Sequence, residues 1–228
     1  MKTHNFSAGP SILPQSVISS ASKKVLEFDN ELSILEISHR SNAFTDVMSE
    51  SISLVRDILD VPTNYSIIFL QGGASLQFCM VALNLLKKNN GSAAYLNTGT
   101  WSKKAIFEAK KFGEIEIVGD SSHKNFNYIP KDFKISDSHD YFHCTSNNTI
   151  YGSQIKTFPK CNIPMVCDMS SDIFSRKINV NQFGLIYAGA QKNLGPAGAT
   201  LVIVKDEILG KSERDIPSML DYRTHIDK

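Results

Sequence analysis

One lysine of the chain stands in an unusual setting, the small-residue stretch YAGAQKNLGPAG from Tyr187 to Gly198. The apolar run FGLI comes just before it and ATLVIV just after it, which predicts that Lys192 follows a buried strand. Small neighbours let the backbone and a flat ligand come close to the amine. Lys192 could therefore form a Schiff base with a cofactor that carries a carbonyl group. Taken alone, the stretch fits an ordinary loop lysine at least as well.

A carboxylate occupies a similar place earlier in the chain. Asp168 ends the apolar run IPMVCD, and open α/β sheets bind ligands at the carboxyl ends of their strands. There it could hold a protonated ring nitrogen and keep a cofactor ring a good electron acceptor. The residues SSD that follow also fit an aspartate in a turn or at a helix start. Asp168 and Lys192 together, each at a strand end, are more specific than either residue alone.

A glycine pair predicts an anion site. In LQGGASLQF a strand ends, two glycines turn the chain, and a helix begins near Ser75. Free N–H groups at a helix N-terminus bind phosphate well. The spacing matches neither the dinucleotide fingerprint nor the P-loop, and a plain strand-to-helix turn explains it too.

Two further side chains follow expected strands. Trp101, the only tryptophan, opens a helical pattern in NTGTWSKKA and could stack on an aromatic ring. Thr149, in SNNTIYG, could donate a hydrogen bond to a ring hydroxyl. Core packing for Trp101 and a polar turn for Thr149 remain open alternatives.

The elements that would position these residues alternate along the chain. Apolar runs without polar alternation predict strands at 65–70, 93–97, 114–119, 141–145, 163–168, 184–189 and 199–204. Helical patterns occupy 44–61, 75–88 and 100–113, the first with Val47, Ile52, Val55, Ile58 and Leu59 on one side. This alternation predicts an α/β fold, a three-layer sandwich around a mostly parallel sheet. We expect 120–140 to be a loop and the first 40 residues to lie outside the sheet.

Composition excludes several classes of partner. The 228 residues carry 24 basic and 23 acidic side chains, a formal charge of +1, which gives no electrostatic case for nucleic acid or an anionic membrane. The four cysteines show no metal-ligand spacing and fit reduced thiols in a cytoplasmic protein, so we expect no metal site. We find no signal peptide and no apolar run long enough to span a membrane.

Several motifs, in the same order along the chain, resemble those of a known enzyme family. NFSAGPSILP, ISHRS, QGGASLQF, TGTWS, TSNNTIYG, CDMSSDIFSR and YAGAQKNLGPAG resemble those of the phosphoserine aminotransferases, class V aminotransferases of the fold type I pyridoxal-phosphate enzymes. The matches span residue 5 to about residue 204. The resemblance implies that pyridoxal 5′-phosphate is the cofactor and that Lys192 is the catalytic lysine. It implies cofactor contacts for Ala74, Ser75, Trp101, Thr149, Asp168, Gln191 and Lys192.

The same resemblance implies the substrates. Arg40, with His39 beside it, matches an arginine that binds an acidic group of the substrate, and its planar fork suits carboxylate and phosphate. Without the resemblance, a surface arginine would explain Arg40 better. The implied reaction moves an amino group between L-glutamate and 3-phosphohydroxypyruvate in serine biosynthesis, with a role in pyridoxine biosynthesis also open. A homodimer is implied as well.

The resemblance also sets the expected domains. We expect an N-terminal arm at 1–15 and a cofactor-binding large domain at 16–228, because the family's chains continue into a small C-terminal domain that this chain lacks. A truncated, inactive fragment that binds the cofactor is therefore the alternative to an active enzyme. A cysteine desulfurase is a weaker alternative, because no cysteine lies in an expected mobile loop.

Overall fold

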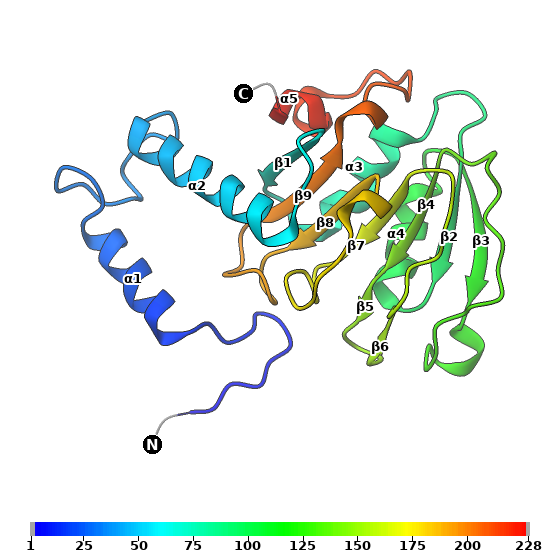
Figure 1. Cartoon of the computed structure of the whole chain (residues 1–228), viewed down its shortest axis with the longest axis horizontal. Helices are drawn as coiled ribbons and strands as arrows, with labels where there is room; N and C mark the ends of the chain where they lie inside the picture. The colour runs from blue at the N-terminus through cyan, green and yellow to red at the C-terminus, as the bar shows by residue number, and fades with distance from the viewer. Residues whose placement is uncertain (1–2, 227–228) are drawn as a thin grey trace.

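The apolar runs pair into one seven-stranded sheet in a computed structural model that describes residues 3–226 (Figure 1). The order across the sheet is β1-β9-β8-β7-β4-β2-β3. The strands are β1 (Tyr65–Leu70), β2 (Ser92–Asn97), β3 (Glu114–Asp120), β4 (Tyr141–Thr145), β7 (Met165–Asp168), β8 (Leu185–Gly189) and β9 (Thr200–Lys205). All the strand predictions are confirmed, with ends shifted by no more than two residues. The outer ends of the expected domains, residues 1–2 and 227–228, lie outside the described residues.

The sheet is mostly parallel. β2 pairs in parallel with β3 and β4, β4 with β7, and β7 with β8. β9 alone runs against its neighbours, β8 and β1. The parallel strands β4, β7 and β8 are buried along their whole length, which explains why their sequences lack polar alternation. The predicted fold class is confirmed.

Helices cover one face of the sheet. α3 (Gly73–Leu85), α4 (Thr100–Ala109) and the short α5 (Tyr222–Ile226) pack there on a core that includes Tyr95, Tyr187 and Tyr222. α3 is buried on several sides, as expected for a helix that touches both the sheet and α4.

The other face is covered differently. Only the end of α2 (Asn42–Leu59) reaches it, through Val55 and Leu59, and irregular connections bring in Met169, Ile173 and Phe183. Loops therefore form much of the third layer. The prediction that Ile58 shares the buried face of α2 is wrong, because Ile58 is 60% exposed.

Small elements complete the chain. A two-stranded hairpin of β5 (Asn147–Asn148) and β6 (Ser153–Gln154) follows β4. The 3₁₀ turns are η1 (Ser122–Lys124), η2 (Val180–Gln182), η3 (Asp206–Ile208) and η4 (Ser218–Leu220). The expected loop at 120–140 contains η1 and no strand beyond the end of β3.

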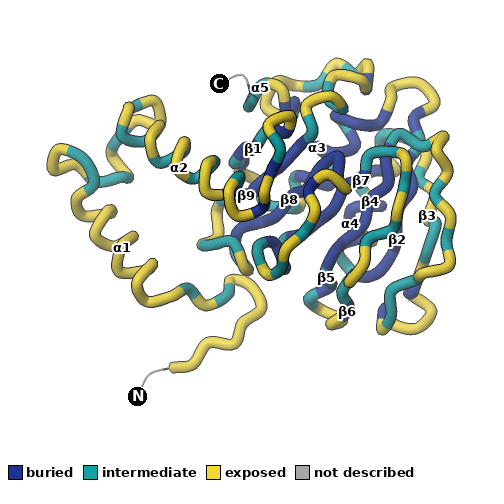
Figure 2. The backbone as a smooth tube through the Cα atoms, in the orientation of Figure 1, coloured by how far each residue is buried: buried dark blue, intermediate teal, exposed yellow. Residues whose placement is uncertain are grey.

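The N-terminal segment, residues 3–40, lies outside the sheet as expected. Its helix α1 (Gln15–Leu26) has no buried residue, and Figure 2 shows this segment exposed beside a sheet whose inner strands are mostly buried. Within residues 3–226, no helix combines the length and the apolar character needed to cross a membrane.

Candidate active site

The carboxyl ends of the parallel strands bring most of the predicted site residues to one edge of the sheet. A cavity of about 120 Å³ lies at this edge. Its lining residues are Gly73, Ala74, Ser75, Phe78, Trp101, Thr145, Asn147, Asp168, Ser170, Ser171, Gln191 and Lys192. These residues follow β1, β2, β4, β7 and β8, so the fold joins segments that are far apart in the sequence.

Lys192 is held by a short hydrogen bond. Its Nζ donates to Thr149 Oγ1 at 2.5 Å and lies 5.9 Å from the centre of the Trp101 ring. Desolvation lowers the pKa of Lys192, and the nearby charge of Asp168 opposes part of this shift. A lowered pKa leaves more of the amine neutral near pH 7, which is the form that attacks a carbonyl group.

Asp168 is buried at the end of β7. Its Oδ1 accepts from the backbone N–H of Ser170 at 3.0 Å and from the Ser170 hydroxyl at 2.6 Å. Burial raises the pKa of Asp168, while the Ser170 hydrogen bonds and Lys192 act in the opposite direction. No described residue donates a hydrogen bond to Oδ2, so this oxygen can take a donor from a ligand in the cavity.

The N-terminus of α3 lies where the sequence predicts an anion site. Gly72 precedes the helix with φ 87°, a conformation that glycine adopts readily, and no side chain caps the helix. The first N–H groups of a helix have no partner within the helix. Gly73, Ala74 and Ser75 thus present backbone donors to the cavity, as the sequence predicts for a phosphate.

Two buried polar atoms in the cavity wall lack partners. Neither the Trp101 indole N–H nor the Thr145 hydroxyl has a hydrogen-bond partner in the described part of the chain. Buried polar groups normally have partners, so unmatched ones at a cavity favour a ligand. Sequence reasoning missed Thr145, and it missed Ser170, whose hydroxyl also accepts from the Gly189 N–H at 3.0 Å. The serines after Asp168 are the available signal, but their composition also fits an ordinary turn.

The N-terminal arm contacts the lysine loop directly. The Ser11 N–H donates to the Gln191 carbonyl at 2.9 Å, and the Ser11 hydroxyl donates to the Lys192 carbonyl at 2.5 Å. A Cβ added to Gly9 would lie 3.1 Å from Lys192 Cγ, so glycine lets the arm pass close to the lysine side chain. The motifs NFSAGP and AGAQKNLGPAG are therefore in contact.

The structure does not bring the predicted substrate-binding residues to this cavity. His39 and Arg40 are exposed in the loop before α2, and neither lines the cavity of Lys192. His39 instead borders a different cavity between α2, β1 and α5.

The donor set suits a cofactor such as pyridoxal phosphate. An amine, a buried carboxylate with one free oxygen, an indole and an uncapped helix N-terminus surround one cavity. Among residues 3–226, no group of three or more histidine, cysteine, aspartate or glutamate side chains is placed to hold a metal ion.

Comparison with known proteins agrees with this geometry. The family model described as Aminotransferase class-V matches residues 3–217. A curated phosphoserine aminotransferase of Flavobacterium johnsoniae is 62% identical over 228 residues, which cover 99% of this chain and 64% of that protein.

Solved structures show the same similarity. A phosphoserine aminotransferase, described for radiation damage of its Schiff base, is 47% identical with a TM-score of 0.95, over 99% of this chain and 64% of that chain. The structure of phosphoserine aminotransferase with bound pyridoxal phosphate from Trichomonas vaginalis is 33% identical with a TM-score of 0.92, over 99% and 64%. The chain thus spans about 64% of the length of these relatives.

Proposed function

The chain belongs to the class V aminotransferase family, and from this premise we propose that it forms the cofactor-binding part of a phosphoserine aminotransferase. The observation that carries the proposal is the single cavity in which Lys192, Asp168 and the uncapped N-terminus of α3 meet. The proposed reaction is reversible amino transfer between L-glutamate and 3-phosphohydroxypyruvate, giving O-phospho-L-serine and 2-oxoglutarate. Similarity to named relatives supports this choice of substrates.

The cofactor proposed for this cavity is pyridoxal 5′-phosphate. When bound, it supplies an aldehyde that combines with amines and a ring that accepts electrons from the substrate's α-carbon. The N–H groups of Ala74 and Ser75 would hold its phosphate, with Gln191 close by, and the Trp101 indole would lie against its ring. Asp168 Oδ2 would accept the hydrogen bond of the protonated ring nitrogen.

Lys192 has the catalytic role in this proposal. Its Nζ would take the proton from the substrate's α-carbon as general base and deliver it as general acid to C4′, the carbon of the cofactor's aldehyde group. Desolvation lowers the pKa of this amine, so that more of it is neutral near pH 7 than for an exposed lysine. Thr149 directs Nζ through the 2.5 Å hydrogen bond and would also lie near the ring hydroxyl.

Arg40 and His39 remain the proposed substrate-binding residues. Arg40 suits a carboxylate or phosphate because its guanidinium group can form two parallel hydrogen bonds. Both residues are exposed and away from the cavity of Lys192, so their role requires an approach from another segment or another chain.

We also propose a homodimer in the cytoplasm. A second cavity of about 660 Å³ adjoins Ser75 and is bordered by Phe107, Phe126 and Tyr151. Apolar side chains around an opening beside the anion site favour its closure by another chain. The four cysteines are free, which fits a reducing compartment. Light scattering of the purified protein measures the mass and tests the dimer.

A half-reaction tests the proposed activity. The protein is loaded with pyridoxal phosphate and mixed with glutamate, and the visible absorbance is followed as it converts to that of pyridoxamine phosphate. Conversion together with release of 2-oxoglutarate supports the aminotransferase. Binding of the cofactor without conversion supports the alternative of an inactive cofactor-binding fragment, and absence of binding contradicts both.

A further inference from the structure

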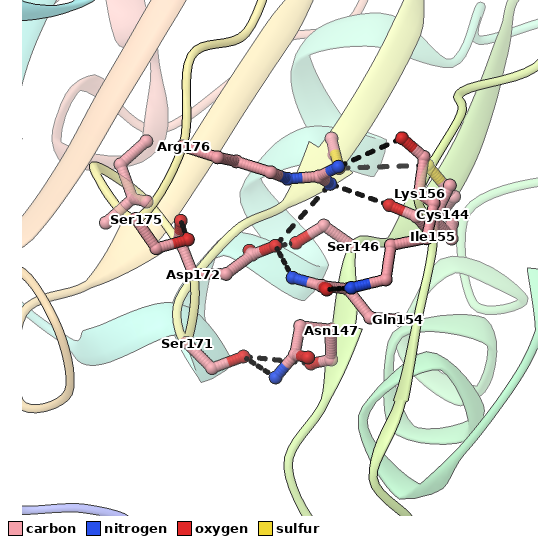
Figure 3. Close-up of polar contacts among 12 residues, drawn as sticks. Cys144, Ser146, Asn147, Gln154, Ile155, Lys156, Ser171, Asp172, Ser175 and Arg176 are labelled. Atoms are coloured by element: carbon pink, nitrogen blue, oxygen red, sulfur yellow. Dashed lines mark hydrogen bonds and ion pairs between the residues drawn. The ribbon is translucent and has the colours of Figure 1, made fainter.

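A second buried aspartate follows the site, and the proposed reaction does not use it. Asp172 lies in the loop after β7, its side chain is 6% exposed, and it does not line the cavity of Lys192. Figure 3 shows its carboxylate among side chains from the β5–β6 hairpin and from its own loop.

Both oxygens of Asp172 are engaged. Oδ1 accepts a hydrogen bond from the hydroxyl of Ser146, which directly follows β4. Oδ2 accepts from Gln154 Nε2 at 3.1 Å and forms an ion pair with Arg176 Nη2 at 3.7 Å. The carboxylate thereby joins the two ends of the hairpin segment to the loop after β7.

Arg176 strengthens the same connection. It donates to the carbonyl oxygens of Ile155 at 2.6 Å and of Lys156 at 3.0 Å, just beyond β6 (Figure 3). We call Asp172, Arg176, Ser146 and Gln154 the Asp172 clamp. It holds the base of the hairpin through residues that do not line the cavity.

The other parts of the hairpin face the site. Thr149, in the turn between β5 and β6, accepts the hydrogen bond of Lys192 Nζ. Asn147 lines the cavity and is linked to Ser171 by two hydrogen bonds of 2.9 Å. The Asp172 clamp and the hydrogen bond to Lys192 therefore both hold the same small hairpin.

Stability alone explains the Asp172 clamp poorly. Burying a carboxylate costs free energy, and the ion-pair distance of 3.7 Å to the partly exposed Arg176 recovers only part of it. Apolar residues can replace such groups without loss of stability, whereas a charged acceptor with several donors fixes one arrangement of its neighbours.

We propose that Asp172 is a positioning residue for Lys192: by clamping Ser146, Gln154 and Arg176, it fixes the hairpin that carries Thr149, and Thr149 orients the lysine amine. The contacts of the Asp172 clamp are part of the folded chain and do not depend on the cofactor. Its consequence for the reaction rests on the proposed function.

The test compares Asp172→Ala and Asp172→Asn with a matched control, Asp140→Ala, in the full-length protein. The Asp140 side chain is 7% exposed and pairs with Lys87 at 3.3 Å, but it lies at the opposite end of β4. Hydrogen exchange is measured by mass spectrometry on the protein without cofactor. The rate of borohydride trapping of pyridoxal phosphate on Lys192 is measured separately.

We expect Asp172→Ala to speed exchange of the amides of residues 147–155 by about tenfold and to leave α3 unchanged. Trapping on Lys192 should slow by about tenfold or more, because a displaced amine attacks poorly. Asp172→Asn keeps an acceptor for Ser146, so its hydrogen exchange and its trapping rate should both lie between those of wild type and Asp172→Ala. If Asp172→Ala does not fold, Asp172→Asn alone provides the test. Asp140→Ala should change neither readout.

Two results would overturn the inference. One is hairpin exchange within about twofold of wild type in both Asp172 variants. The other is an equal increase in the Asp140→Ala control, which would mean a general loss of stability. If the wild-type protein traps no pyridoxal phosphate, the proposed function is wrong, while the exchange measurement still decides whether the clamp exists.

Discussion

At the carboxyl edge of the sheet, Asp168 is 5% exposed and hydrogen-bonded, whereas in the N-terminal segment Leu26 is 77% exposed and α1 buries nothing. Both regions carry residues to which the resemblance gives a role. Parallel strands hold the residues of the sheet edge from several sides. The described contacts hold the N-terminal segment mainly through Ser11. The sheet itself thus places the residues proposed to bind the cofactor, while the role proposed for Arg40 and His39 requires further contacts.

The largest expected effect lies at the sheet edge. Lys192→Ala removes the amine that bonds the cofactor, so borohydride trapping and amino transfer should fall below detection. The matched change in the other region, Lys24→Ala in α1, should leave both at wild-type values. The measurement is the visible absorbance of the loaded protein before and after borohydride. Trapping of the cofactor at a single site of the Lys192 variant would contradict the role proposed for Lys192.

The next effect concerns stability and uses the same substitution in both regions. Leu201, in β9, is fully buried, and its replacement by alanine should lower the free energy of unfolding by about 3 kcal/mol. Leu26→Ala in this chain should change it by less than about 0.5 kcal/mol. Urea unfolding of both variants gives the two values. Equal losses would show that α1 is packed as tightly as the sheet.

Asp168→Asn should keep cofactor binding and slow turnover by about 100-fold, because a neutral amide stabilises the protonated ring nitrogen poorly. The absorbance titration with pyridoxal phosphate gives the affinity, and a coupled assay for 2-oxoglutarate in the full-length protein gives the rate. Turnover close to wild type would remove Asp168 from its proposed role.

A smaller and different effect is expected in the N-terminal segment. Arg40→Ala should raise the KM for glutamate by about tenfold, through loss of a charge-assisted hydrogen bond, without changing cofactor affinity. An unchanged KM would contradict the substrate role of Arg40. A lower cofactor affinity would instead place Arg40 with the residues of the sheet edge.

The smallest effect is a pH shift that links the two charged groups of the site. Burial lowers the pKa of Lys192, so the rate of borohydride trapping should rise with pH and reach half its maximum below 10.5, the ordinary lysine value. Asp168 opposes that shift, so Asp168→Asn should move the midpoint to still lower pH. A midpoint that moves upward in this variant would contradict the proximity of the two groups.

Strong local signals explain what could be predicted from the sequence. The sheet strands are apolar runs bounded by turns, and the residues that follow strands of one parallel sheet must meet at one edge. The cavity that contains Trp101, Asp168 and Lys192 follows from this geometry. The roles given to these residues remain predictions, as do the domain limits.

Other features left no such signal. The strands of the hairpin, β5 and β6, have only two residues each and are polar, so no hydrophobic period predicts them. α1 has no buried residue, so no apolar face packed against a core marks this helix in the sequence. Asp172 follows two serines and has the composition of an ordinary turn, although its carboxylate is buried by contacts with residues far away in the sequence.

The hydrogen bonds from Ser11 to the lysine loop have a consequence for synthesis of the chain. Ser11 and Lys192 are 181 positions apart, so the first emerges from the ribosome long before the second. At typical translation rates the interval is roughly 9 to 36 seconds. During that time the NFSAGP segment has no partner in the lysine loop, and its contact closes a very long loop of chain. Attachment of the arm is therefore a late event in folding, and it can occur only after the strand that leads to the lysine has been made.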